Sequence, residues 1–258
     1  MVKIIMHGCC GHMGQVISQI VKEDADAQIV AGIDPFDNGK MEYPVYKSLE
    51  DCKEEADVVI DFASAKAEDA LLDYCGAHKL PVVVCTTGLS EEQLTAVEEA
   101  SKQVAVLKSA NMSLGINMLM KILQDAAKIL VPAGFDIEIV EKHHNRKLDA
   151  PSGTAITLAE GILENIDRKD KWVKGTLVAP DGSLSGNTVY APDELPVSSV
   201  REGEVPGIHT IRYDSEADSI SITHDAKNRK GFALGVVLAA EYTAQHEGFL
   251  GMNDLFQF

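Results

Sequence analysis

Six consecutive residues, 142 to 147, gather most of the groups that could bind an anion or move a proton. They read Lys-His-His-Asn-Arg-Lys, in a chain of 258 residues whose formal net charge is −17. A basic run of this kind is often only a solvated loop. Metal binding by His143 and His144 is disfavoured, because adjacent side chains diverge and the local sequence offers no third ligand. We expect no metal here.

The residues after this cluster favour a binding site over a plain surface loop. Leu148 to Ala155 form a turn that begins a helix, so Gly153 and Thr154 present backbone N–H groups and a hydroxyl at a helix N-terminus. A carboxylate could dock there while Lys147 and the two histidines face its other side. The sequence therefore predicts an anion pocket with proton donors.

A second group of residues is typical of dinucleotide binding. Gly8, Gly11 and Gly14 are spaced G-x-x-G-x-x-G directly after a strand-like run, where a tight turn lets a pyrophosphate approach a helix N-terminus. Asp34 follows Gly14 by 20 residues and could accept hydrogen bonds from ribose hydroxyls. Its carboxylate would repel a 2′-phosphate, which favours NADH over NADPH, although His12 or Lys40 could reach that phosphate.

The secondary-structure elements that position these groups follow two different patterns along the chain. Strand-like runs at 3–7, 28–34, 57–62, 81–85 and 104–108 alternate with helical segments at 12–22, 65–78 and 90–102. This alternation predicts an α/β fold with a Rossmann-like, doubly wound parallel sheet. A helix at 114–130 is followed by strands at 135–141, 171–178, 197–201, 207–213 and 219–224, interrupted by one helix at 154–165. These strands predict an α+β domain with a mixed sheet.

Because the pattern of elements changes near residue 114, we expect two domains. Residues 1–113 would form a dinucleotide-binding domain, completed by 225–258, where an apolar helix at 230–245 returns to it. Residues 114–224 would form a domain for substrate binding and oligomerisation.

Composition excludes several classes of protein. Apolar residues make up 45% and charged residues 24%, which argues against disorder, collagen and coiled coil. The negative charge disfavours nucleic acid and anionic membranes as partners. All five cysteines precede residue 86 without C-x-x-C spacing, and no signal peptide or membrane-length apolar run is visible. We expect a cytoplasmic protein with no membrane partner.

At this point the sequence resembles the 4-hydroxy-tetrahydrodipicolinate reductase (dihydrodipicolinate reductase) family of the diaminopimelate route to lysine. The stretch 141–155 is similar to the family signature E-x-H-H-x-x-K-x-D-A-P-S-G-T-A. Other matches are the loop 8–14, Asp61-Phe62, 86–88, 109–115, 201–203, 207–209, and His224 with Arg229, Phe232 and Ala233. The resemblance thus runs along nearly the whole chain.

The resemblance implies an NADH- or NADPH-dependent enzyme that reduces 4-hydroxy-2,3,4,5-tetrahydrodipicolinate, with loss of water, to 2,3,4,5-tetrahydrodipicolinate. It implies that His143 donates or accepts a proton, that Lys147 donates one, that His144 contacts substrate, and that Gly153 and Thr154 cradle a carboxylate. The residues implied to line the cofactor are Gly8, Cys9, Cys10, Gly11, His12, Met13, Asp34, Cys85, Thr86, Thr87, Ser109, Ala110, Asn111 and Met112. It also implies a homotetramer.

Two alternatives remain at this point. An amino-acid semialdehyde dehydrogenase would need a catalytic thiol in the second domain, where no cysteine occurs. A nonenzymatic dinucleotide sensor would keep the glycine loop and Asp34 but would not need the 143–147 cluster. His12 stands where many family members carry Arg, which bears on the use of NADPH.

Overall fold

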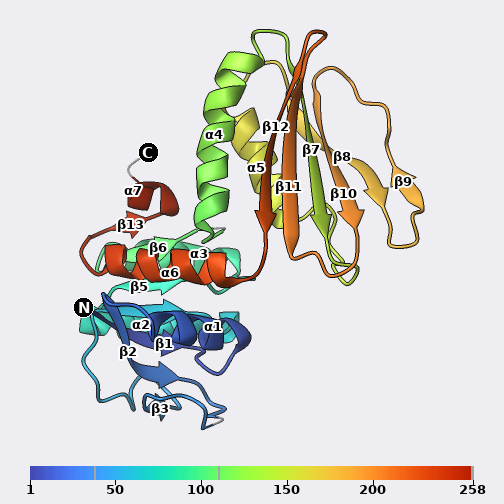
Figure 1. Cartoon of the computed structure of the whole chain (residues 1–258). Helices are drawn as coiled ribbons and strands as arrows, with labels where there is room; N and C mark the ends of the chain where they lie inside the picture. The colour runs from blue at the N-terminus through green and yellow to red at the C-terminus, as the bar shows by residue number, and fades with distance from the viewer. Residues whose placement is uncertain (38, 110, 257–258) are drawn as a thin grey trace. The chain divides into compact units, whose positions relative to one another are not determined.

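The computed structural model describes residues 1–37, 39–109 and 111–256 (Figure 1). The chain divides into two compact units. One consists of Met1–Leu114 with Lys230–Phe258, and the other of Gly115–Arg229. Of the expected cofactor residues, Ala110 lies outside the described residues.

The first unit is built on a seven-stranded parallel sheet with the order β13-β6-β5-β4-β1-β2-β3. The order reverses at β1, so that β2 and β3 lie on one side of it and β4, β5 and β6 on the other. In sheets of this kind, ligands bind at the carboxyl ends of the strands where the order reverses, here β1 and β4. The strands are β1 Val2–His7, β2 Ala27–Ile33, β3 Val45–Tyr46, β4 Val58–Asp61, β5 Val82–Val84, β6 Val106–Lys108 and β13 Phe249–Leu250.

Helices cover both faces of this sheet because its strands are apolar on both sides. Alternate residues of β1 enter different cores: Ile4 packs with residues of α1 and α6, whereas Ile5 packs with residues of α2 and α3. The helices of this unit are α1 His12–Val21, the short η1 Ala65–Ala67, α2 Glu68–His78, α3 Glu91–Ala100, α6 Lys230–Thr243 and α7 Met252–Phe256. The predicted doubly wound arrangement is confirmed.

The second unit is built on a six-stranded mixed sheet with the order β12-β11-β7-β10-β8-β9. Strand β10 runs parallel to β7 and β8, whereas β11 is antiparallel to β7 and β12, and β9 is antiparallel to β8. The strands are β7 Asp136–His143, β8 Lys171–Val178, β9 Leu184–Gly186, β10 Glu194–Arg201, β11 Gly207–Asp214 and β12 Ser219–Ala226. The predicted mixed sheet is confirmed.

Two helices, α4 Leu114–Leu130 and α5 Gly153–Leu163, pack against this sheet and form a hydrophobic core with it (Figure 1). Ile137 and Ile139 on β7 pack in that core with Leu123 of α4, because alternate residues of a strand point to one face. The Tyr213 hydroxyl donates a 3.0 Å hydrogen bond to the Leu123 carbonyl oxygen. This bond joins α4 to β11, and the neighbouring strand β7 carries His143 at its carboxyl end. Among the described helices, none is long and apolar enough to cross a membrane.

Candidate active site

A buried carboxylate organises the carboxyl end of β7. Glu141 is fully buried, and His143 Nδ1 lies 2.5 Å from its Oε2 atom. The Arg201 guanidinium donates to both carboxylate oxygens, at 3.0 and 2.9 Å. Register explains the approach, because β7 and β10 are parallel and pair Arg201 with His143. Burial raises the pKa of Glu141, but hydrogen bonds from His143, Arg201 and Ser199 outweigh it and lower the pKa to about 2.

This carboxylate leaves one imidazole nitrogen of His143 for other chemistry. Contact with Glu141 occupies Nδ1, so Nε2 is the nitrogen that can exchange a proton with a substrate. That nitrogen faces Gly207, where an added Cβ would lie only 3.0 Å away. Glycine at this position therefore keeps space beside Nε2 of His143.

A second histidine packs against the first. The rings of His143 and His209 meet edge to face with centroids 5.3 Å apart. Burial, followed by the nearby charge of His143, lowers the pKa of His209 to about 4. His209 is therefore neutral near pH 7, and its Nε2 lies 3.2 Å from the Ser152 hydroxyl.

The same buried ion pair fixes the loop that carries Lys147. Arg201 donates hydrogen bonds to the backbone carbonyls of Lys147 and Asp149, at 3.3 and 2.6 Å. The Lys147 ammonium pairs with the Asp149 carboxylate at 2.9 Å and is mostly shielded, with 21% of its side chain exposed. This contact outweighs partial burial and lowers the pKa of Asp149.

The N-terminus of α5 completes this cluster. Ser152 caps the helix by accepting from Ala155 N–H, while its own N–H donates to Glu141 at 3.2 Å. Gly153 is exposed, and open space surrounds the position of an added Cβ there. The first N–H groups of a helix have no intrahelical partner, so this open end suits a carboxylate.

The structure thus brings together His143, Lys147 and the start of α5 around the Glu141–Arg201 pair. His144 is half-buried, and its Nδ1 atom is buried without a hydrogen-bond partner among the described residues. The motif at 141–155 indicated the first group. The sequence patterns did not predict that Arg201 pairs with Glu141 or that His209 packs against His143. Both Arg201 and His209 lie in stretches that match the family.

In the first unit, the glycine loop forms the turn that the sequence predicts. Gly8 has a φ of 80°, and a Cβ there would lie 2.6 Å from the Phe62 carbonyl oxygen. A Cβ on Gly14 would lie 2.3 Å from the Gly8 carbonyl oxygen. Helix α1 has no side-chain cap and no acidic residue in its first turn. Its N-terminal N–H groups therefore fit the pyrophosphate of a dinucleotide.

Asp34 is buried and bound to this loop. Its carboxylate accepts hydrogen bonds from Cys10 N–H at 3.0 Å and from Phe36 N–H at 2.9 Å. Each oxygen retains a further lone pair for a ribose hydroxyl. Asp34 therefore joins the end of β2 to the glycine loop as well as offering acceptors.

The remaining predicted cofactor residues lie in different environments. Thr86 is buried, and its hydroxyl donates to Asp61 at 2.5 Å, whereas Thr87 is exposed. Cys9 and Met112 have buried side chains within the core of the first unit. Gly11 and His12 are exposed, Cys10, Met13, Cys85, Ser109 and Asn111 are half-buried, and the Ser109 hydroxyl lies 3.1 Å from the Asn111 carbonyl oxygen.

Comparison with known proteins assigns both units to one family. The family model described as dihydrodipicolinate reductase, N-terminus, matches residues 2–112, and the one described as dihydrodipicolinate reductase, C-terminus, matches residues 115–256. The chain belongs to the dihydrodipicolinate reductase family. It is accordingly an oxidoreductase of lysine and diaminopimelate biosynthesis that uses NAD(P)H, and the predicted enzyme class is confirmed.

Individual relatives agree with the dihydrodipicolinate reductase family. A 4-hydroxy-tetrahydrodipicolinate reductase of Caldanaerobacter subterraneus subsp. tengcongensis is 43% identical over 99% of this chain and 98% of the relative. One from Clostridium novyi is 40% identical over 100% and 99%. The solved dipicolinate-bound dihydrodipicolinate reductase of Paenisporosarcina sp. TG-14 has a TM-score of 0.78 and 26% identity, with 97% of each chain covered.

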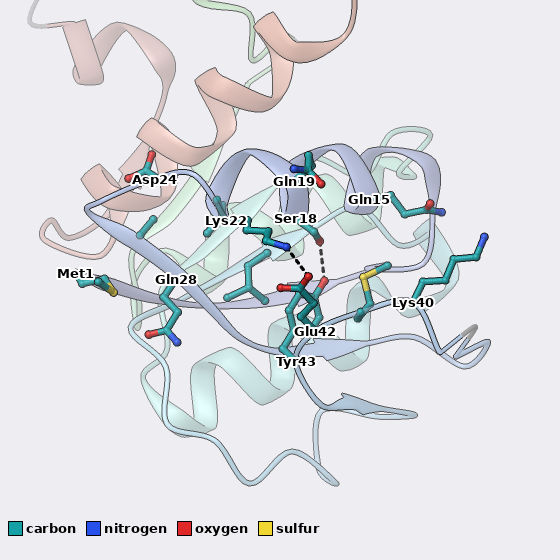
Figure 2. Close-up of a pocket in the computed structure, with 14 residues that line it drawn as sticks. Met1, Gln15, Ser18, Gln19, Lys22, Asp24, Gln28, Lys40, Glu42 and Tyr43 are labelled. Carbon is teal, nitrogen blue, oxygen red and sulfur yellow. Dashed lines mark hydrogen bonds and ion pairs between the residues drawn. The ribbon is translucent and has the colours of Figure 1, made fainter.

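A hollow of about 600 Å³ is lined by residues of α1, β2 and the segment 40–43 in this dihydrodipicolinate reductase family member (Figure 2). Figure 2 shows Gln15 and Lys40 at one end and Met1 at the other. The Gln15 amide donates to the Cys10 carbonyl oxygen at 2.7 Å, which places that end of the hollow beside the loop. An ion pair between Lys22 and Glu42 lines the hollow further along.

Proposed function

We propose that the chain reduces 4-hydroxy-2,3,4,5-tetrahydrodipicolinate to 2,3,4,5-tetrahydrodipicolinate with His143 and Lys147 as its proton-handling groups. The observation that carries this assignment is the 2.5 Å contact between the buried Glu141 carboxylate and His143 Nδ1. A carboxylate in that position fixes the imidazole orientation and stabilises the ring when it is protonated. Nε2 is then the nitrogen that takes or gives the proton.

The substrate is a cyclic dicarboxylate, and the cluster offers matching donors. One carboxylate would accept from the N–H groups of Gly153 and Thr154 at the open start of α5. His144 and the Lys147 ammonium would bind the substrate from the other side. The Lys147 carbonyl is tied to Arg201 at 3.3 Å, so the position of the loop is fixed before substrate arrives.

The chain's own residues complete the reaction. A bound nicotinamide supplies a hydride. Loss of the 4-hydroxyl group as water leaves a conjugated imine, and addition of the hydride to it leaves an electron-rich enamine. The enamine carbon must then be protonated, and we assign this proton transfer to Nε2 of His143. Lys147 stabilises negative charge as it develops or donates the proton itself.

We further propose that NADH is preferred over NADPH. The buried Asp34 carboxylate, held by two backbone N–H groups, would repel a 2′-phosphate. His12 and Lys40 are exposed groups that could oppose this repulsion, and Lys40 lines the hollow near Gln15. Gly8, Gly11 and Met13, with Thr87, Ser109 and Asn111, would line the rest of this cofactor site.

A homotetramer in the cytoplasm completes the proposal. Strand β12 is an edge strand of the second sheet with most of its residues exposed, and such an edge suits pairing between copies. The five cysteines are all free thiols, which suits a reducing compartment. Light scattering during gel filtration should report the mass of four chains, and a monomer would refute the assembly.

The assay couples substrate synthesis to cofactor oxidation. A synthase would form the substrate in place from pyruvate and aspartate semialdehyde, while NADH and NADPH oxidation are followed in parallel. We expect oxidation that depends on the synthase, is faster with NADH, and falls sharply in Lys147→Ala. The exposed Lys128→Ala serves as the matched control and should retain full activity. Folded wild-type protein that binds NADH but oxidises none would overturn the assignment.

A further inference from the structure

Two thiols and a carboxylate converge in the glycine loop. The Sγ atoms of Cys9 and Cys10 are 3.8 Å apart, and an Asp34 carboxylate oxygen lies with them in a group whose ligand atoms are all within 4.8 Å of one another. Cys9 and Asp34 are buried and Cys10 is half-buried. This is the one such cluster of His, Cys, Asp and Glu ligands in residues 1–37, 39–109 and 111–256.

The sulfur separation matches the geometry of a tetrahedral thiolate site. Two metal–sulfur bonds of about 2.3 Å at a tetrahedral angle place the sulfur atoms about 3.8 Å apart. The observed separation is 3.8 Å, so the thiols need no rearrangement relative to each other. Cys10 is held by hydrogen bonds, since its N–H donates to Asp34 and its carbonyl accepts from Gln15. The Cys9 side chain is buried in the core of the first unit.

We propose that Cys9, Cys10 and Asp34 form a binding site for a thiophilic divalent cation such as Zn²⁺ or Cd²⁺. Soft sulfur ligands select these ions over Mg²⁺ and Ca²⁺, which prefer oxygen ligands. Binding replaces the two thiol protons, which are released to solvent, and no electron is transferred. The fourth position would be taken by water on the exposed side of Cys10.

Occupancy of this site would block the cofactor, a consequence that rests on the proposed function. The ion would hold the loop that has to receive the pyrophosphate and would engage the carboxylate that has to accept the ribose hydroxyls. We therefore infer that thiophilic cations and NAD(P)H exclude each other. The site is an inhibitory one, which is consistent with the expectation that catalysis uses no resident metal.

The test begins with Cd²⁺ added to reduced, cofactor-free protein in oxygen-free buffer. We expect an ultraviolet cadmium–thiolate charge-transfer band that saturates at one ion per chain, with proton release into weak buffer. Cys10→Ser and Asp34→Asn should each weaken Cd²⁺ binding at least about tenfold, because each removes a ligand. Cys52→Ser replaces a half-buried cysteine outside the cluster and should leave the titration unchanged. Mg²⁺ should not compete.

The cadmium–thiolate band tests the metal site, and calorimetry of NADH binding tests whether the metal excludes the cofactor. Cys9 is fully buried, so Cys9→Ser is used only where circular dichroism shows a native fold, and Cys10→Ser carries the test otherwise. Absence of the band in wild type, or a band of equal strength in Cys10→Ser, would overturn the metal site. Calorimetry of NADH binding should show at least about tenfold weaker affinity with Zn²⁺ present, and unchanged affinity would overturn mutual exclusion. Metal-free protein that binds no NADH would instead refute the proposed function, while the cadmium band still decides the site.

Discussion

Two buried glutamates, one in each unit, have pKa values that are shifted in opposite directions. Glu141 and Glu68 are 0% and 1% exposed, yet the pKa of Glu141 is lowered to about 2 while that of Glu68 is raised to about 7. Burial dominates at Glu68, with the neighbouring Asp61 charge adding to it. No donor among the described residues reaches either Glu68 carboxylate oxygen, whereas Glu141 receives hydrogen bonds from Arg201, His143 and Ser152 N–H.

The comparison teaches that partners, rather than depth, decide what a buried carboxyl can do. With its donors in place, Glu141 is a fixed negative charge that can orient a histidine. Without such donors, the pKa of Glu68 is about 7, so its carboxyl group is about half protonated at that pH. Substitutions that remove the partners or the charge, one at a time, test this difference between the two glutamates.

The largest effect is expected from the group that Glu141 orients. His143→Ala should lower kcat by about 10²- to 10⁴-fold, the usual range for a general acid or base. Steady-state assays with NADH, at saturating substrate from the coupled synthase, measure this. The exposed His246→Ala is the matched control and should retain wild-type turnover. Wild-type kcat in folded His143→Ala would remove this residue from the mechanism.

Removing the main partner of Glu141 should convert it into a residue like Glu68. Arg201→Leu leaves a buried carboxylate with too few donors, and it should lower the free energy of unfolding by about 3 to 5 kcal/mol. Urea unfolding at pH 7 provides the measurement. The matched control is Arg212→Leu, because Arg212 is 46% exposed and pairs with Asp214 on the surface, where a pair contributes at most about 1 kcal/mol.

The pH dependence of this variant follows from the sign of the shift. The pKa of Glu141 is about 2 in the folded protein and ordinarily 4.5. Its contribution to stability is therefore present above pH 4.5 and is lost as the pH falls towards 2. The difference in the free energy of unfolding between wild type and Arg201→Leu should therefore become smaller as the pH falls from 4.5 to 2. Equal losses in Arg201→Leu and Arg212→Leu at pH 7 would contradict the role of the buried pair.

Both sheets could be predicted from the sequence because the hydrophobic periodicity of their strands and helices is visible locally. The helix expected at 114–130 and the strand expected at 171–178 match α4 and β8 to the residue. Short strands such as β3, with 2 residues, were missed because so few residues carry no periodicity. Site partners that are distant in sequence could not be predicted. Arg201 lies 60 residues after Glu141, and the pairing of β10 with β7 brings the two together. Nothing local distinguishes Glu68 from an exposed acid in the first turn of a helix.

Glu68 provides the reverse experiment, in which removal of a charge should stabilise the protein. Its pKa is about 7 when folded and ordinarily 4.5, so the folded state binds the proton more tightly and stability falls as the pH rises from 4.5 to 7. Glu68→Gln should therefore raise the free energy of unfolding at pH 8 by on the order of 2 to 3 kcal/mol. At pH 4 the two proteins should be equally stable. Urea unfolding at both pH values, with the exposed Glu99→Gln as control, tests this. A gain of the same size at pH 4 would show that the charge is not the cause.

The smallest effect concerns a third buried carboxylate, that of Asp34, which accepts hydrogen bonds from two backbone N–H groups. Asp34→Asn keeps an acceptor for Cys10 and Phe36 but removes the charge that faces a 2′-phosphate. One unit of charge repulsion in a partly hydrated site is worth about 1 kcal/mol, so the ratio of kcat/KM for NADH over NADPH should fall about fivefold to tenfold. Asp37→Asn is the matched control, since Asp37 is exposed and also accepts a loop N–H, that of Gly39. A ratio that is unchanged in Asp34→Asn would place cofactor selection elsewhere, with Lys40 the next residue to replace. Because the substitution leaves Glu141 and its partners untouched, kcat with saturating NADH should stay near the wild-type value.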